Sequence, residues 1–70
     1  MKNTMPTFKP TNPYITYGLN SALVWEIIEQ ESVRRRAIKW FNRYSECMEG
    51  YSSFALTDIR TGEVLRQVWK

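Results

Sequence analysis

The chain has to fold without a covalent or metal cross-link, which restricts it to one small domain. Its 70 residues include a single cysteine, Cys47, and no histidine. One cysteine cannot form an intramolecular disulfide, and a structural zinc site takes about four nitrogen or sulfur ligands. A domain of this size buries only roughly 60% of the surface that its unfolded chain exposes. We therefore expect a thin core that depends on large side chains or on self-association.

Large aromatic side chains are available for that core, because the chain has three tryptophans, four tyrosines and three phenylalanines. The single thiol favours a reducing compartment, and no apolar stretch is long enough for a signal peptide or a transmembrane helix. We therefore expect a cytoplasmic protein that makes no membrane contact. A formal charge of +3 and a pI near 9.3 permit contact with acidic proteins or nucleic acid.

The N-terminal segment predicts an extended arm over residues 1–12, followed by a single small α+β domain over residues 13–70. Prolines recur in the arm, and each removes a backbone donor and biases the preceding residue toward extended conformations. Residues 14–17 are aromatic or β-branched, which favours a short strand that ends at Gly18.

Residues 22–48 contain no proline or glycine and are mostly good helix formers, which predicts an α-helix over about 21–48. The apolar residues of this helix fall on two stripes that face different directions. The first stripe is Leu23, Val24, Ile27 and Ile28, and the second is Val33, Ala37, Trp40, Phe41, Tyr44 and Met48. Two alternatives remain open: two helices meet near Ser32, or one long helix buries a different face at each end. In the second alternative we expect a homo-oligomer through the first stripe.

The C-terminal residues give the strongest local signal, which predicts a β-hairpin over about 51–69. Two strand-like runs flank residues 58–62, where Asp58 can start a turn and Gly62 can take a positive φ. With Asp58 opposite Glu63, one apolar face of the hairpin is expected to pack on the second stripe. That face carries Phe54, Leu56, Leu65 and Trp69, with Leu56 opposite Leu65 and Phe54 opposite Gln67. The predicted fold is therefore α+β, with an arm, a short strand, a long or broken helix and a hairpin packed on the helix.

The side-chain chemistry argues against an enzyme and against a bound metal or cofactor. Without histidine, neither the commonest general base nor a Ser-His or Cys-His nucleophile is available within the chain. Cys47 falls near a predicted helix C-terminus, where the helix dipole disfavours a thiolate, so we expect a buried structural thiol. The three glycines are isolated in the sequence and form no phosphate-binding loop.

One charged feature predicts a binding surface. Arg34 begins a basic run, and the four basic residues after it share about a third of the circumference of a helix. These four residues, which we call the basic ridge, are Arg35, Arg36, Lys39 and Arg43. The alternative is a solvated helix face near the negative end of the helix dipole, partly paired to Glu29 and Glu31. We predict that the ridge binds a partner together with the aromatic residues Trp25, Tyr14 and Tyr17.

We therefore predict a small non-enzymatic binding protein that attaches to a larger, acidic protein and modulates or inhibits it. Stand-alone chains of this size without enzyme chemistry are typical of accessory factors carried by phages and other mobile elements. The alternative is a nucleic-acid-binding regulator that uses the basic ridge as a dimer. The sequence contains no helix-turn-helix, zinc-finger or RRM motif, which favours the protein partner.

Overall fold

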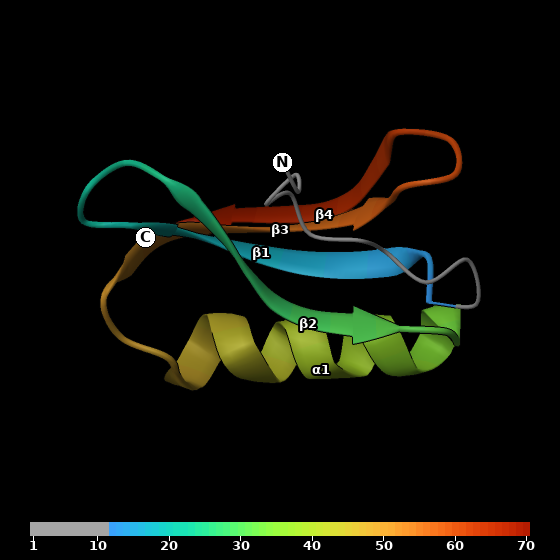
Figure 1. Cartoon of the computed structure of the whole chain (residues 1–70). Coiled ribbons are helices and arrows are strands. Elements are labelled where there is room, and N and C mark those ends of the chain that lie inside the picture. The colour runs from blue at the N-terminus through green and yellow to red at the C-terminus, as the bar shows by residue number, and fades with distance from the viewer. Residues whose placement is uncertain (1–11) are drawn as a thin grey trace, which may run out of the picture.

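A computed structural model describes residues 12–70, which form a four-stranded antiparallel sheet with one α-helix packed on it (Figure 1). In chain order the elements are β1 (Tyr14–Asn20), β2 (Trp25–Glu31), α1 (Arg34–Cys47), β3 (Tyr51–Asp58) and β4 (Glu63–Trp69). The strand order is β2-β1-β3-β4, so α1 carries the chain from the edge strand β2 past β1 to β3. The predicted arm, apart from Asn12, lies outside the described residues.

The predicted helix over 21–48 is wrong in its first half, where residues 25–31 form β2 instead. The turn between β1 and β2 gives the physical reason. Asn20 Oδ1 accepts hydrogen bonds from the backbone N–H groups of Ala22 and Val24, at 2.9 and 3.0 Å, and Leu23 has a φ of 62°. An asparagine that bonds the nearby backbone in this way offers the chain an alternative to a helix. Helix propensity is a weak preference, and strand pairing with β1 overrides it.

A β-bulge in β2 interrupts the inward–outward alternation by which a strand is recognised in a sequence. Tyr17 pairs with Ile27 and Thr16 pairs with Glu29, so Ile28 is an extra residue between two pairs. Ile28 packs on the core beneath α1, whereas Ile27 shares the opposite face of the sheet with Tyr17. Two adjacent isoleucines therefore resemble part of a helical stripe, although both lie in a strand.

One cluster of the core lies between α1 and the sheet, and Ile15, Leu19 and Ala55 are buried on the opposite face. Ala37 and Phe41 of α1 pack on Phe54 and Leu56 of β3, and each of these four residues is at most 2% exposed. The predicted contact between these residues is present, but it belongs to a four-stranded sheet and a short helix. Gly18 of β1 is required nearby, because a Cβ atom at this position would lie only 2.6 Å from the Tyr51 ring.

The turn between β3 and β4 lies where the sequence places it. Asp58 pairs with Glu63, and Gly62 has a φ of 77°. The Asp58 carbonyl oxygen accepts hydrogen bonds from the N–H groups of Thr61 and Gly62, at 3.3 and 2.8 Å. The glycine is needed because this positive φ is costly for other residues.

The register beyond this turn differs from the prediction, because a second bulge makes Leu65 an extra residue. Leu56 therefore lies opposite Arg66, and the next inward pair is Phe54 with Val68. Trp69 lies opposite Ser53, on the face of the sheet away from α1. A bulge moves every later residue of a strand to the other face, so simple alternation placed Trp69 on the wrong side.

The two faces of the sheet differ in charge. The register places uncharged residues on the face away from α1, which we call the open face: Ile15, Tyr17, Leu19, Trp25, Ile27, Gln30, Ser53, Ala55, Thr57, Val64, Gln67 and Trp69. The charged residues of the four strands all share the α1 side: Glu26, Glu29, Glu31, Asp58, Glu63 and Arg66. The fold therefore separates a charged side from an uncharged one.

Candidate functional site

The structure distributes the predicted partner-binding residues over three places. The basic ridge lies on the exposed surface of α1. Trp25 and Tyr17 lie together on the open face, and Tyr14 lies on the α1 side of the sheet against the core. The ridge and the aromatic residues therefore do not form one continuous surface.

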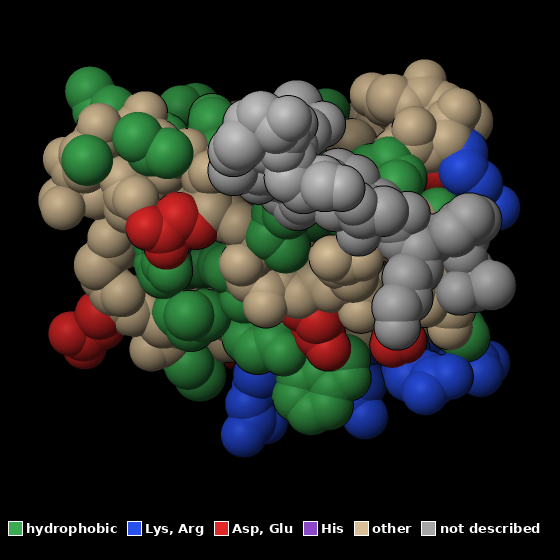
Figure 2. Space-filling model, in the orientation of Figure 1, with side chains coloured by type: hydrophobic (Ala, Val, Ile, Leu, Met, Phe, Trp, Pro, Cys, Tyr) green, Lys and Arg blue, Asp and Glu red, His purple; other side chains and the backbone are tan. Residues whose placement is uncertain are grey.

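The basic ridge is exposed along its whole length, and Figure 2 shows Lys and Arg side chains gathered where α1 lies in Figure 1. Arg36 Nε lies 3.8 Å from Glu31 Oε2, a weak and partly exposed ion pair. In the described part of the chain, the other three ridge residues, Arg35, Lys39 and Arg43, have no carboxylate at ion-pair distance. These three cations remain available to a partner.

The N-terminus of α1 is unfavourable for the charges that it carries. The helix begins with Arg34, Arg35 and Arg36 and has no acidic residue in its first turn. Val33, at the N-cap position, makes no side-chain capping hydrogen bond. This end of a helix is positively polarised, which corrects the expectation that the run lies near the negative end of the dipole. Residues that make a helix end less stable in this way occur where function requires them.

Trp40 belongs to the ridge surface, although the sequence placed it in a buried stripe. It is 37% exposed, and Lys39 Nζ lies 6.0 Å from its ring centroid. The ring stacks on Tyr44 with a centroid separation of 6.0 Å. A hydrogen bond with Glu29 raises the pKa of the Tyr44 hydroxyl and ties this pair to β2. In the sequence, the position of Trp40 beside Lys39 and three residues before Arg43 could have assigned it to the ridge surface.

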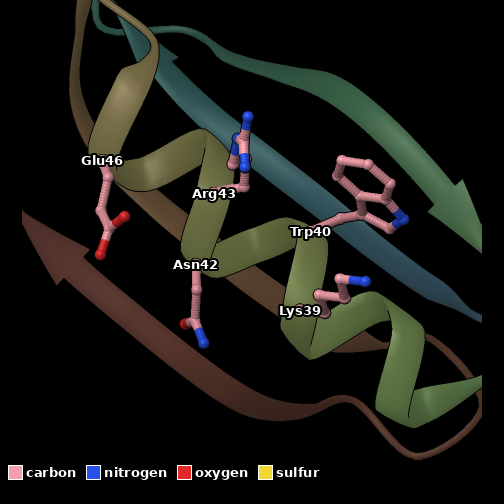
Figure 3. Close-up of a pocket in the computed structure, with 5 residues that line it drawn as sticks. All are labelled: Lys39, Trp40, Asn42, Arg43 and Glu46. Atoms are coloured by element: carbon pink, nitrogen blue, oxygen red, sulfur yellow. The ribbon is translucent and has the colours of Figure 1, made fainter.

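A shallow depression runs along the outer surface of α1 (Figure 3). Its lining consists of Lys39, Trp40, Asn42, Arg43 and Glu46. All five side chains come from a single helix, so no second element of residues 12–70 encloses the depression. Small-molecule sites are normally concave and closed on several sides. The depression therefore suits contact with the surface of a macromolecule.

The open face contains a groove of about 300 Å³ that is lined by Tyr17, Trp25, Ala55 and Thr57. On this face β3 presents only small side chains, and two of them, Ala55 and Thr57, form the floor of the groove. The side chains of Tyr17 from β1 and Trp25 from β2 line the rest of the groove. Burial raises the pKa of the Tyr17 hydroxyl, which stays neutral at physiological pH.

Apolar side chains remain exposed at both edges of the open face. Trp25 and Ile27 of β2 are 42% and 36% exposed, and Val64 and Trp69 of β4 are 53% and 66% exposed. Between the two edges, Ile15, Leu19, Ser53 and Ala55 of the central strands are 0–9% exposed, so the exposed apolar residues form two separate edges rather than one continuous patch.

Tyr14 takes part in an internal cluster at one end of the sheet. Arg60 Nη2 donates hydrogen bonds to Tyr14 Oη and to Asp58 Oδ2, both at 3.0 Å. The guanidinium also lies 5.3 Å from the centroid of the Tyr14 ring. The hydrogen bonds from Arg60 hold the pKa of the Asp58 carboxyl below its usual range. Tyr14 therefore supports the turn between β3 and β4.

The predicted self-association stripe does not form. Leu23 and Val24 lie in and beside the turn between β1 and β2, where they are 75% and 55% exposed. Ile27 faces the open side of the sheet and Ile28 the core. The four residues point in different directions because a turn and a bulge, not a helix, set their orientation.

The remaining sequence features add no chemistry to these surfaces. Cys47 is exposed at the last residue of α1, which corrects the expectation of a buried thiol. Within residues 12–70, no group of three or more acidic or cysteine side chains is arranged to hold a metal ion. The helix of the described region is too short and too polar to cross a membrane. Comparison with protein-family models, curated proteins and solved structures finds no match.

Proposed function

We propose that the chain is a small non-enzymatic binding protein whose basic ridge attaches to an acidic surface of a larger protein and modulates it. One observation carries this proposal. Arg35, Lys39 and Arg43 are exposed without carboxylate partners in the described residues, on a helix whose first turn is made less stable by its own arginines. A role in folding does not explain Arg35 in the first turn of the helix, whereas contact with an acidic partner does.

Trp40 adds an apolar anchor to the charged contact. Tryptophan and arginine are enriched among the residues that dominate binding energy at protein interfaces. The ring of Trp40 lies beside the Lys39 ammonium group and is held by Tyr44, so little side-chain freedom is lost when a partner covers it. The charges would steer the partner to the ridge, and Trp40 would contribute to retaining it.

The test reverses two ridge charges. We expect the Lys39→Glu, Arg43→Glu variant to lose a partner that the wild-type chain captures from cells of its native host and that mass spectrometry identifies. The matched control is Arg66→Glu with Lys70→Glu, which has the same net charge and changes two exposed cations away from the ridge. Equal capture by both variants would refute the proposal.

The same ridge supports a second candidate, because a row of unpaired cations also suits a phosphate backbone. Binding of duplex DNA and RNA over a salt series separates the two candidates. A steep fall in affinity with salt, lost in the ridge variant and kept in the control, would favour nucleic acid. No binding near physiological salt would leave the acidic protein as the partner.

A further inference from the structure

The outer edge of β4 is accessible to another strand. Within residues 12–70 the sheet ends at β4, which pairs only with β3. Every residue of β4 except Leu65 is exposed. Proteins usually protect a sheet edge with charged side chains, and the other edge strand, β2, carries three glutamates. β4 has only one acidic and one basic residue, so it is the less protected edge.

The backbone of β4 has hydrogen-bonding groups that point away from the sheet. The Val68 carbonyl oxygen accepts a hydrogen bond from Ser53 Oγ of β3 at 2.9 Å, and Lys70 N–H donates to a β3 carbonyl oxygen at 2.9 Å. Both residues therefore direct backbone groups toward β3. These directions alternate along an antiparallel strand, so the N–H and C=O groups of Gln67 and Trp69 point outward.

We propose that this edge pairs with β4 of a second copy of the chain, antiparallel and around a two-fold axis at Gln67. The outward N–H of Gln67 in each copy then donates to the Gln67 carbonyl oxygen of the other copy. The two four-stranded sheets join into one continuous sheet.

The apolar side chains of β4 match one another in this register. Leu65 is an extra residue against β3, and we take it to be an extra residue against the second copy as well. Val64 of each copy then lies opposite Trp69 of the other. Both side chains belong to the open face and are exposed in the single chain, at 53% and 66%. Cross-strand pairs of this kind stabilise a sheet.

The charges at the two ends of β4 are also complementary. The same register places Glu63 of each copy opposite Lys70 of the other. Glu63 lies on the α1 side, and so does Lys70, whose Nζ is 5.7 Å from the centroid of the Phe54 ring. In the described part of the chain neither residue has an ion-pair partner. The two-fold axis repeats this opposite-charge pair, so each dimer contains it twice.

Other ways of joining two copies are less favourable. A two-fold axis at β2 would bring Glu26, Glu29 and Glu31 toward the same residues of the other copy, and like charges on paired strands are destabilising. Pairing through β4 meets no such obstacle from the helix, because α1 packs mainly on β1, β2 and β3 (Figure 1). Both basic ridges then lie on the same side of the joined sheet.

A charge swap tests the register in the full chain. Analytical ultracentrifugation should show a wild-type dimer at micromolar to millimolar concentration. Glu63→Lys and Lys70→Glu should each raise the dissociation constant by roughly fivefold or more, because each places like charges opposite one another twice in the dimer. The double variant Glu63→Lys, Lys70→Glu should return the constant to near the wild-type value. Glu49→Lys, which makes the same charge change at an exposed position outside the strands, is the matched control and should dimerise normally.

Hydrogen exchange tests the backbone contact independently of any substitution. Exchange of the Gln67 amide should slow as the concentration rises, whereas the Lys70 amide, which is already bonded to β3, should change little. Gln67→Pro removes the outward donor and should abolish the dimer, since proline is tolerated at such edge positions.

Three results would overturn the inference: a wild-type chain that stays monomeric at millimolar concentration, assemblies larger than a dimer, or a dimer that both single charge reversals leave intact. None of them bears on the basic ridge, because each copy carries a complete ridge that partner capture tests separately.

Discussion

The α1 side and the open face are built on the same four strands, yet they expose different chemistry. The α1 side combines a buried apolar core with every charged residue of the strands and with the basic ridge. The open face has only uncharged positions on its strands and leaves two tryptophans exposed. The comparison teaches that a sheet can place all its charged residues on the side that a helix covers, and leave apolar side chains of the other side exposed only along its edges. The predictions below test this division, from the largest expected effect to the smallest.

Truncation of a buried residue beneath α1 and of an exposed edge residue on the open face should have very different costs. Leu56→Ala removes a fully buried side chain beneath α1 and should lower the free energy of unfolding by about 2–5 kcal/mol, enough to unfold so small a domain. Val64→Ala on the open face should change it by about 0.5 kcal/mol or less, because Val64 is 53% exposed at the edge strand β4. Urea denaturation measures both values. Similar costs for the two variants would contradict the placement of Leu56 in the core and of Val64 at an exposed edge.

The close packing of the α1 side predicts that it tolerates no added atom at Gly18. A Cβ atom there would lie 2.6 Å from the Tyr51 ring and 2.9 Å from Ile28 Cδ1. Gly18→Ala should therefore destabilise the fold by about 1–3 kcal/mol, because overpacking forces neighbours to move. Thermal denaturation measures the effect, and Ser21→Ala in the exposed β1–β2 turn is the control. A Gly18→Ala variant as stable as the control would show that this side is loosely packed.

Acid should weaken the α1 side through Asp58. The hydrogen bonds from Arg60 lower the pKa of Asp58 in the folded chain, so the ionised form stabilises the fold at neutral pH. This contribution is present above the unfolded pKa of about 4 and is lost as the pH falls through the lower folded pKa. Stability measured from pH 7 to pH 2 should fall more steeply in the wild type than in Asp58→Asn. Parallel curves would show that the Arg60 contact does not contribute.

The smallest effect concerns the N-terminus of α1, where we expect stability and binding to change in opposite directions. Arg35→Glu places a carboxylate at the positive end of the helix and should raise the free energy of unfolding by about 0.3–1 kcal/mol. It should also weaken partner binding, because it removes a ridge cation. Arg43→Glu, which lies in the C-terminal half of α1, should weaken binding without the gain in stability. A loss of stability in Arg35→Glu would remove the main support for a functional ridge.

Much of the local structure in the second half of the chain could be predicted from the sequence, because it depends on local signals. Asp58 and Gly62 define the turn between β3 and β4, and Ala37 and Phe41 mark the buried side of α1 at helical spacing. These residues act through backbone conformation and periodicity, which a single sequence displays.

Less of the first half of the chain could be predicted. The expected strand over residues 14–17 is present in β1, although β1 continues past Gly18 to Asn20, but the structure of residues 25–31 depends on partners distant in the sequence. Residues 25–31 become a strand only because β1 lies beside them, and β1 in turn pairs with β3. The bulges at Ile28 and Leu65 change which face of the sheet the later residues occupy, and no local sequence pattern predicts a bulge at either position. The open face was therefore missed, although Trp25 and Tyr17 were each predicted to bind a partner.

The three tryptophans allow one measurement to test the separation of the two sides. Trp25 and Trp69 lie on the open face, and Trp40 lies on α1 beside the ridge. We propose to follow their indole N–H signals by NMR before and after addition of the captured partner, with a soluble paramagnetic probe that broadens exposed groups. The signal of Trp40 should become protected, while those of Trp25 and Trp69 stay exposed. Protection of Trp25 and Trp69 with no change at Trp40 would contradict the account.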